Sequence, residues 1–146
     1  MQVLDFAIGI DCGARGNLKE FSPIGFAASA DEFSTWTIEP LAEFSFRLPP
    51  LRRDLQITSV VLPFLAEEAS LTKQDCWIYL NGLFVHFCSV TAQSEISFTV
   101  AREGFSPRVN RVSFVLPNAT SPKALGRGED IRTLGLAFSR VAATQV

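Results

Sequence analysis

Apolar and polar residues alternate with a period of two along several segments of this chain. The alternation is clearest over residues 43–48, 95–100 and 111–116. Successive side chains of a β-strand point to opposite faces, so each segment predicts a strand with one face in a core and the other in a wetter setting. We expect Phe46, Phe98 and Phe114 of these segments, and Leu136 further along the chain, to lie in the core.

Other strand-like segments bring the expected total to about eight. They are Gln2–Ile10, Leu55–Leu62, Cys76–Leu80, Leu83–Val90 and Thr133–Val141. Pro and Gly interrupt the chain between them, and no segment sustains the 3.6-residue apolar period of an amphipathic helix. The pattern predicts an all-β fold, namely an antiparallel β-sandwich of jelly-roll topology with no helix longer than about two turns.

Two connectors have a composition of their own. In Ser121–Gly126, Ser and Pro can begin a short helical turn and Gly can end it. Residues 11–32 mix Gly, Ser, Asp and Pro with isolated aromatic residues, which predicts a long loop laid over the sandwich. We expect residues 1–146 to form a single domain.

Composition excludes several classes of protein. Hydrophobic residues make up 47% of the 146 residues, far more than in a disordered chain. The formal net charge of -2 gives no basic surface for nucleic acid. No apolar run reaches the roughly 20 residues of a membrane-spanning helix. The first residues lack the features of a secretory signal, so a cytoplasmic location is expected.

The segment from Cys76 to Val90 predicts a β-hairpin with its turn at Asn81-Gly82. In a two-residue turn the numbers of opposite residues add up to 163, as 81 and 82 do. One face of the hairpin is then entirely apolar and belongs in the core: Cys76, Ile78, Leu80, Leu83, Val85 and Phe87. The other face carries Trp77, Tyr79, Phe84, His86 and Cys88.

In this register Trp77 lies opposite His86 and Tyr79 opposite Phe84, so four ring side chains form one patch. Such rings can stack on the apolar faces of sugars while their polar atoms bind hydroxyl groups. The candidate ligand-binding residues are therefore Trp77, Tyr79, Phe84 and His86. The patch is also compatible with a second half of the core beneath the long loop, or with an interface to another protein.

Three cysteines, Cys12, Cys76 and Cys88, form an odd number that suits free thiols in a reducing compartment. The predicted register puts Cys76 opposite Phe87 and Cys88 on the other face. A disulfide between Cys76 and Cys88 would therefore need a bulge or a different register. We expect all three to be free thiols.

Residues for catalysis are scarce. His86 is the only histidine, there is no Gly-x-Ser-x-Gly motif, and the cysteines lack the spacing of zinc ligands. Asp130 and Arg132 are expected to tie their connector to the neighbouring strand. The sequence predicts neither an enzyme nor a cofactor or metal.

Several short motifs lie in a recognisable order between Ile24 and Val141. They are Trp36, Pro63-Phe64-Leu65, Leu80-Asn81-Gly82, Leu116-Pro117-Asn118-Ala119, Ser121-Pro122, and Asp130, Arg132 and Leu134-Gly135-Leu136. In this order the chain resembles a small jelly-roll, carbohydrate-binding-module-like domain associated with bacterial glycosyltransferases and polysaccharide-synthesis proteins.

The resemblance implies a non-catalytic module that binds a glycan or assists polysaccharide biosynthesis, with a glycan or a glycosyltransferase-type enzyme as partner. The alternative is a protein-interaction or homo-oligomerisation domain that uses the same aromatic hairpin face and has no sugar ligand. Neither hypothesis involves nucleic acid or insertion into a membrane.

Overall fold

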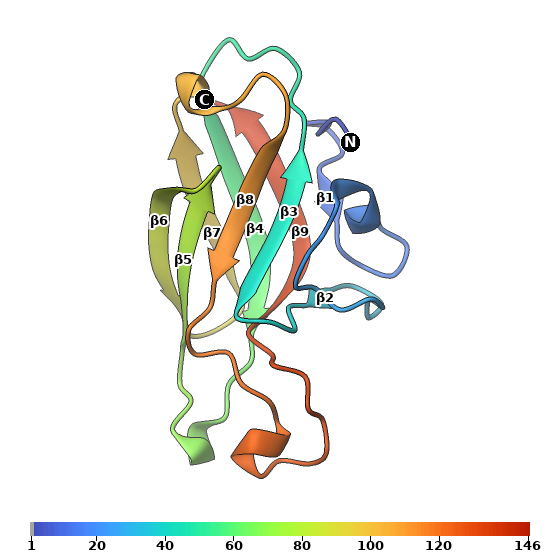
Figure 1. The fold of residues 1–146 in the computed structure, drawn as a ribbon, viewed down its shortest axis with the longest axis vertical. Coiled ribbons are helices and arrows are strands. Elements are labelled where there is room, and N and C mark those ends of the chain that lie inside the picture. The colour runs from blue at the N-terminus through green and yellow to red at the C-terminus, as the bar shows by residue number, and fades with distance from the viewer. Residues whose placement is uncertain (1) are drawn as a thin grey trace.

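The computed structural model describes residues 2–146, which form nine strands in two antiparallel sheets packed face to face (Figure 1). One sheet has the order β1-β9-β4-β7, with β2 also paired to β9, and the other has the order β3-β8-β5-β6. The strands of the first sheet are β1 (Ile10–Asp11), β2 (Thr35–Trp36), β4 (Leu55–Pro63), β7 (Ser94–Val100) and β9 (Leu136–Gln145). Those of the second are β3 (Leu41–Phe46), β5 (Gln74–Leu80), β6 (Leu83–Val90) and β8 (Asn110–Val115).

Without β1, the strand order is β2-β9-β4-β7 in the first sheet and β3-β8-β5-β6 in the second. This order is that of an eight-stranded jelly roll, with β1 as an addition beside β9. The predicted fold class is therefore confirmed. The helices of residues 2–146 are single 3-10 turns, as expected: η1 (Leu18–Phe21), η2 (Glu67–Ala69), η3 (Arg102–Gly104) and η4 (Lys123–Leu125).

The core lies between the two sheets, and the predicted core residues are in it. Phe46, Phe114 and Leu136 are fully buried, and Phe98 is 5% exposed. Phe114 of one sheet meets Phe138 of the other edge-to-face, with ring centroids 4.9 Å apart. The period-two pattern therefore identified the inner faces of β3, β7 and β8 correctly.

The connector before β9 forms the short turn that its sequence predicted. The Ser121 side-chain oxygen accepts a hydrogen bond from the Ala124 N–H at 3.0 Å. After η4, Gly126 takes a left-handed conformation with φ of 72°. Glycine adopts this conformation without a steric penalty, so it ends the turn.

The predicted strand Gln2–Ile10 is wrong. The Asp5 side chain accepts hydrogen bonds from the N–H groups of Ala7, at 2.8 Å, and Ile8, at 3.2 Å. These bonds hold a turn, because a short acidic side chain competes with strand pairing for nearby backbone groups. Strand pairing with β9 begins only at Ile10.

Residues 12–34 run along the β3 and β9 side of the sandwich, on the right in Figure 1. In this segment Leu18 and Phe21 of η1 are buried, and Ile24 pairs with Glu43 of β3. The β5–β6 hairpin lies on the opposite side of the molecule (Figure 1). This segment therefore extends the β3 edge of its sheet and leaves the outer face of the hairpin uncovered.

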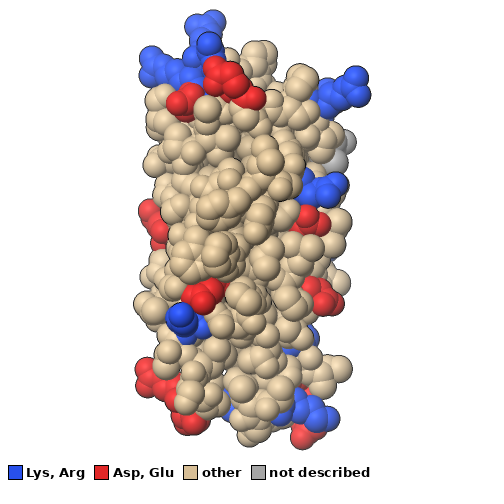
Figure 2. Space-filling view, turned by 60° about the vertical axis from the view of Figure 1, so that its left-hand side comes forward, with Lys and Arg blue, Asp and Glu red and all other residues tan. Residues whose placement is uncertain are grey.

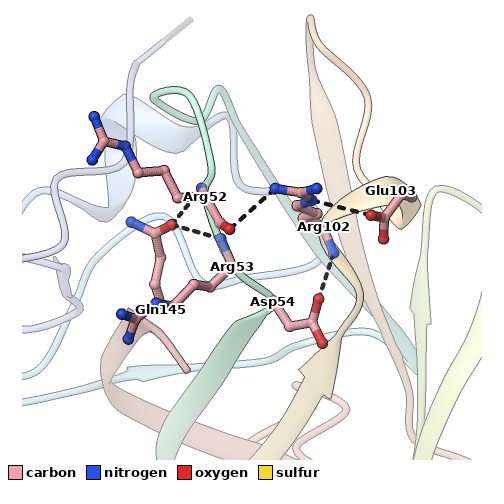
Figure 3. Close-up of polar contacts among 6 residues, drawn as sticks. All are labelled: Arg52, Arg53, Asp54, Arg102, Glu103 and Gln145. Atoms are coloured by element: carbon pink, nitrogen blue, oxygen red, sulfur yellow. Dashed lines mark hydrogen bonds and ion pairs between the residues drawn. The ribbon is translucent and has the colours of Figure 1, made fainter.

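Polar contacts hold the loops together at one end of the sandwich (Figure 3). The Gln145 side-chain oxygen accepts hydrogen bonds from the N–H groups of Arg52, at 2.7 Å, and Arg53, at 3.1 Å. Arg102 donates from its guanidinium to the Arg52 carbonyl oxygen at 3.1 Å and from its N–H to Asp54 at 3.2 Å. The end of β9 is thereby tied to the β3–β4 and β7–β8 connectors. None of the helices formed by residues 2–146 has the length and apolarity needed to span a membrane.

Candidate ligand-binding face

The β5–β6 hairpin turns at Asn81-Gly82, as predicted, but its register changes after two residue pairs. Both turn residues have positive φ values, 51° and 84°, which suit a tight two-residue turn. Tyr79 lies opposite Phe84, and the next pair is Ile78 with His86. Val85 is therefore an extra residue in β6, forming a β-bulge.

The bulge makes part of the predicted site wrong. Trp77 lies opposite Phe87 instead of His86, and Cys76 lies opposite Cys88 instead of Phe87. His86 consequently belongs to the inner side of the sandwich, where its ring stacks on Phe98 of β7 at a centroid distance of 6.2 Å. The structure brings Trp77, Tyr79 and Phe84 together and places His86 away from them.

Four aromatic rings gather on the outer face of the hairpin, and we call them the aromatic cluster: Trp77, Tyr79, Phe84 and Phe87. The Trp77 ring centroid lies 4.5 Å from that of Phe87 and 5.8 Å from that of Phe84. The Tyr79 and Phe84 centroids are 5.9 Å apart. Trp77, Phe84 and Phe87 are 41%, 54% and 42% exposed, so this face is not a second half of the core.

A polar row continues from the aromatic cluster across the same sheet. Tyr79 of β5 pairs with Ser113 of β8, which pairs with Glu43 of β3. The Ser113 hydroxyl donates a hydrogen bond to Glu43 Oε2 at 2.6 Å. Neighbouring strands are about 4.8 Å apart, so the row places a carboxylate about 10 Å from the Tyr79 backbone.

A hollow of about 370 Å³ adjoins this row at the hairpin turn. It is lined by Glu43, Asn81, Gly82, Val109, Arg111 and Ser113. Its volume is in the range of small-molecule sites. A carboxylate, a guanidinium and a hydroxyl around one hollow can accept hydrogen bonds from a ligand and donate them to it.

The surface around the aromatic cluster carries few charges. Figure 2 shows the side of the molecule on which β6 lies, with Lys, Arg, Asp and Glu gathered mainly at the two ends and along the margins. The broad field between them consists of other residues (Figure 2). A ligand on this field would meet mainly uncharged surface, with charged groups at its borders.

A larger hollow, of about 480 Å³, lies at the end of the sandwich shown in Figure 3. Its walls are mostly apolar: Leu48, Pro49, Pro50, Leu51, Phe105 and Pro107, with Arg102, Glu103 and Ser106. The Arg102 guanidinium already donates to Glu103 at 3.1 Å and to the Arg52 carbonyl oxygen. Because this cation is engaged within the protein, the hollow offers a ligand less specific hydrogen bonding than the polar row does.

The Asp130–Arg132 pair stabilises its own connector. The Arg132 guanidinium donates to both carboxylate oxygens of Asp130, at 2.7–3.1 Å, and these bonds lower the pKa of Asp130 to about 2. The two ends of the connector are joined by backbone pairing of Thr120 with Leu134, so the predicted tie of this pair to a neighbouring strand is not seen. Within residues 2–146, no three His, Cys, Asp or Glu side chains are grouped to hold a metal ion.

Sequence analysis missed Phe87, Glu43, Arg111 and Ser113. Phe87 was assigned to the core because the bulge was not foreseen. The positions of Glu43, Arg111 and Ser113 on the polar sides of their strands were visible in the alternation. Their approach to the hairpin depends on which strands pair, and β3 and β8 are far apart in the chain.

Comparison with protein-family models gives no match, and comparison with curated protein sequences gives none either. Among solved structures, the chain is similar to part of a family GH115 4-O-methyl-α-glucuronidase with specificity for decorated arabinogalactans, with 10% identity and a TM-score of 0.50. That similarity covers 84% of this chain and spans only 15% of the glucuronidase.

Two carbohydrate-binding modules are also similar in structure. The xylan-binding module CBM15 gives 17% identity and a TM-score of 0.49, covering 98% of this chain and 94% of the module. A family 6 module from Clostridium cellulolyticum, in complex with xylose, gives 11% identity and a TM-score of 0.47, covering 93% of this chain and 95% of the module. At these identities the glucuronidase similarity bears on the fold alone, and the lower TM-scores of the two modules add nothing to it.

Proposed function

We propose that the aromatic cluster and the adjoining polar row bind a glycan, and that the protein is a non-catalytic glycan-binding module. The observation that carries this proposal is the contiguous, uncovered group of Trp77, Tyr79, Phe84 and Phe87 on the outer face of a sheet. Pyranose rings have apolar C–H faces that stack on aromatic rings, and they also carry many hydroxyl groups. A surface that sets aromatic rings beside polar side chains matches both features.

The polar row supplies the second requirement of sugar recognition. The Glu43 carboxylate accepts hydrogen bonds and is oriented by the Ser113 hydroxyl. Arg111 lines the same hollow and brings a guanidinium that donates. A glycan that stacks on Trp77 and extends along the polar row would form hydrogen bonds with both groups. Because each group is charged, these hydrogen bonds are stronger than those between neutral groups.

The chemistry of this face favours binding over hydrolysis. Glycoside hydrolysis commonly uses two carboxyl groups about 5–10 Å apart on either side of the scissile bond. In the part of the chain that the structure describes, Glu43 is the one carboxylate among the residues lining the hollow. His86, the residue that general-base schemes would need, packs on the inner side against Phe98.

The motifs shared with polysaccharide-synthesis proteins supply the second part of the proposal. They support a bacterial polysaccharide or its precursor as the glycan, and a glycosyltransferase-type enzyme as the protein with which this module works. This setting rests on the sequence resemblance, whereas the binding face rests on the geometry.

The test is a glycan array measured alongside size-exclusion chromatography with light scattering, for the wild-type chain and for Trp77→Ala. Removing the central ring should weaken glycan binding by about 2 kcal/mol, or roughly 30-fold, and leave the fold intact. Phe33→Ala is the matched control, because Phe33 is 74% exposed and lies outside the aromatic cluster. This variant should bind as the wild type does.

Other outcomes would overturn the proposal in different ways. In one such outcome the wild-type chain binds no glycan on the array and forms an oligomer, which Trp77→Ala converts to monomers. This would show that the aromatic cluster contacts a second copy of the chain. Glycan binding unaffected by Trp77→Ala would place the site elsewhere. Unfolding of Trp77→Ala would show that the aromatic cluster is needed for stability.

A further inference from the structure

The bulge that moves His86 inward also brings two thiols together. Cys76 of β5 and Cys88 of β6 are direct cross-strand partners. Cys76 is fully buried, and Cys88 is partly buried and packed against the same core, so both side chains lie on the inner side of the hairpin. Both are free thiols, as is Cys12.

The geometry of this pair suits a disulfide. Opposite residues in antiparallel strands have Cα atoms about 4.5–5.5 Å apart. Disulfides span Cα separations of about 4.4–6.8 Å, so no strand would have to move far for a bond to form. The direct pairing sets the two side chains side by side on the same face of the hairpin, and the interaction with the Cys76 thiol lowers the pKa of Cys88.

The two cysteines differ in a way that assigns each a role. Cys88 lies on an edge strand and is only partly buried, and its lowered pKa favours the reactive thiolate. The hydrogen bond to Cys88 and burial raise the pKa of Cys76, so Cys76 stays protonated while Cys88 reacts first. Cys12 is a contrast, because it lies just after β1 without a cysteine paired to it among residues 2–146, and burial raises its pKa to about 12.

We propose that Cys76 and Cys88 form a reversible dithiol–disulfide site, oxidised by a small disulfide such as oxidised glutathione. The Cys88 thiolate attacks one sulfur of that disulfide, whose S–S bond breaks, and the first glutathione leaves as a thiolate. The Cys76 sulfur then loses its proton and attacks Cys88 Sγ, which breaks the mixed disulfide and releases the second glutathione. In total, two cysteine thiols give up two electrons and two protons, and oxidised glutathione takes up both.

The disulfide would act on an edge strand. Among residues 2–146, β6 pairs in its sheet with β5 alone, so no strand of this range pairs with its other edge. Trp77 and Phe87 lie next to the two cysteines in sequence and on the opposite side of the hairpin. The bond would therefore fix β6 to β5 directly beneath the aromatic cluster, and the site is independent of whether that cluster binds a glycan.

The test treats the folded, full-length chain with oxidised glutathione, blocks the remaining thiols and maps the peptides by mass spectrometry. The expected product is a Cys76–Cys88 disulfide that lowers the mass by about 2 Da, leaves Cys12 free and is reversed by dithiothreitol. The control Cys12→Ser should give the same product. Cys76→Ser should stop at a glutathione adduct on Cys88, because the attacking second thiol is missing.

Two results would overturn the proposal. One is a stable glutathione adduct on Cys88 of the wild-type chain, without conversion to the internal disulfide. The other is a Cys76–Cys88 disulfide that forms only after the chain has been unfolded by denaturant. The wild-type measurement decides between these results even if a serine variant fails to fold.

Discussion

The outer faces of β5–β6 and of β4–β7 occupy comparable places in the two sheets but carry opposite chemistry. β6 and β7 are consecutive in the chain and are each the last strand of their sheet. The outward residues of β7 are Glu95, Ser97 and Thr99, and the Ser97 hydroxyl lies 3.1 Å from that of Thr58 on β4. The corresponding face of β5–β6 carries the aromatic cluster.

This difference shows that the fold does not require rings on its outer faces. β7 forms its strand with outward polar and hydroxyl side chains, and its inward Phe98 and Val100 supply the packing. Exposed aromatic residues on an edge strand also favour unwanted association between chains. Packing within the fold therefore does not account for the aromatic cluster, and this supports the proposed function.

The largest expected effect tests whether the inner faces alone carry the stability of both sheets. Phe114→Ala and Phe98→Ala should each reduce the free energy of unfolding by about 3–5 kcal/mol, because each leaves a cavity in a packed core. Urea denaturation monitored by circular dichroism provides the measurement. Losses below about 1 kcal/mol at both positions would mean that the inner faces contribute little.

A smaller loss of stability is expected when the outer face of β5–β6 is made to resemble the polar outer face of β4–β7. Phe84 is 54% exposed, so Phe84→Thr should change the free energy of unfolding by no more than about 1 kcal/mol. The same urea denaturation measures it, with Thr99→Ala on β7 as the matched control. A loss close to that of Phe114→Ala would break the comparison, since the outer face of β5–β6 would then be part of the core.

The smallest change in stability is expected from the Asp130–Arg132 pair, which lies outside both faces. Hydrogen bonds from Arg132 lower the pKa of Asp130 from 3.8 to about 2 in the folded chain. A lowered pKa means that the stabilising contribution is present above pH 4 and is lost as the pH falls toward 2. The pair is exposed, so this change should be slight beside those of the core variants.

Carboxyl NMR titration checks this prediction directly. In Arg132→Ala, the pKa of Asp130 should rise toward the ordinary value for an aspartate. An Asp130 pKa that is the same in this variant as in the wild type would assign the shift to another group.

The sequence was sufficient to predict the fold where polar and apolar residues alternate. Strands β3, β7 and β8 have this pattern, and their inner residues Phe46, Phe98 and Phe114 are buried as predicted. The pattern failed at residues 2–10, where the local hydrogen bonds of Asp5 override the apolar residues around it. Short-range chemistry of this kind is not visible in an alternation of polarity.

The candidate site was predicted only in part, for a different physical reason. Residues Leu83–Cys88 are apolar except for one histidine, so no alternation shows which side chains point inward. The turn fixed the pairing of Tyr79 with Phe84, but on β6 the residues beyond the bulge, His86, Phe87 and Cys88, were assigned to the wrong face. The polar row needed the pairing of β3, β8 and β5, which is set by tertiary packing.

The bulge at Val85 also affects how this chain should be aligned with others. A β6 strand one residue shorter, lacking Val85, would pair regularly and still set Phe87 against Trp77 and Cys88 against Cys76. An alignment that places a gap at residue 85 therefore keeps each side of the hairpin matched to its equivalent. A gap placed three positions later would match outward residues of one chain with inward residues of the other, and would hide both the rings and the paired thiols from comparison.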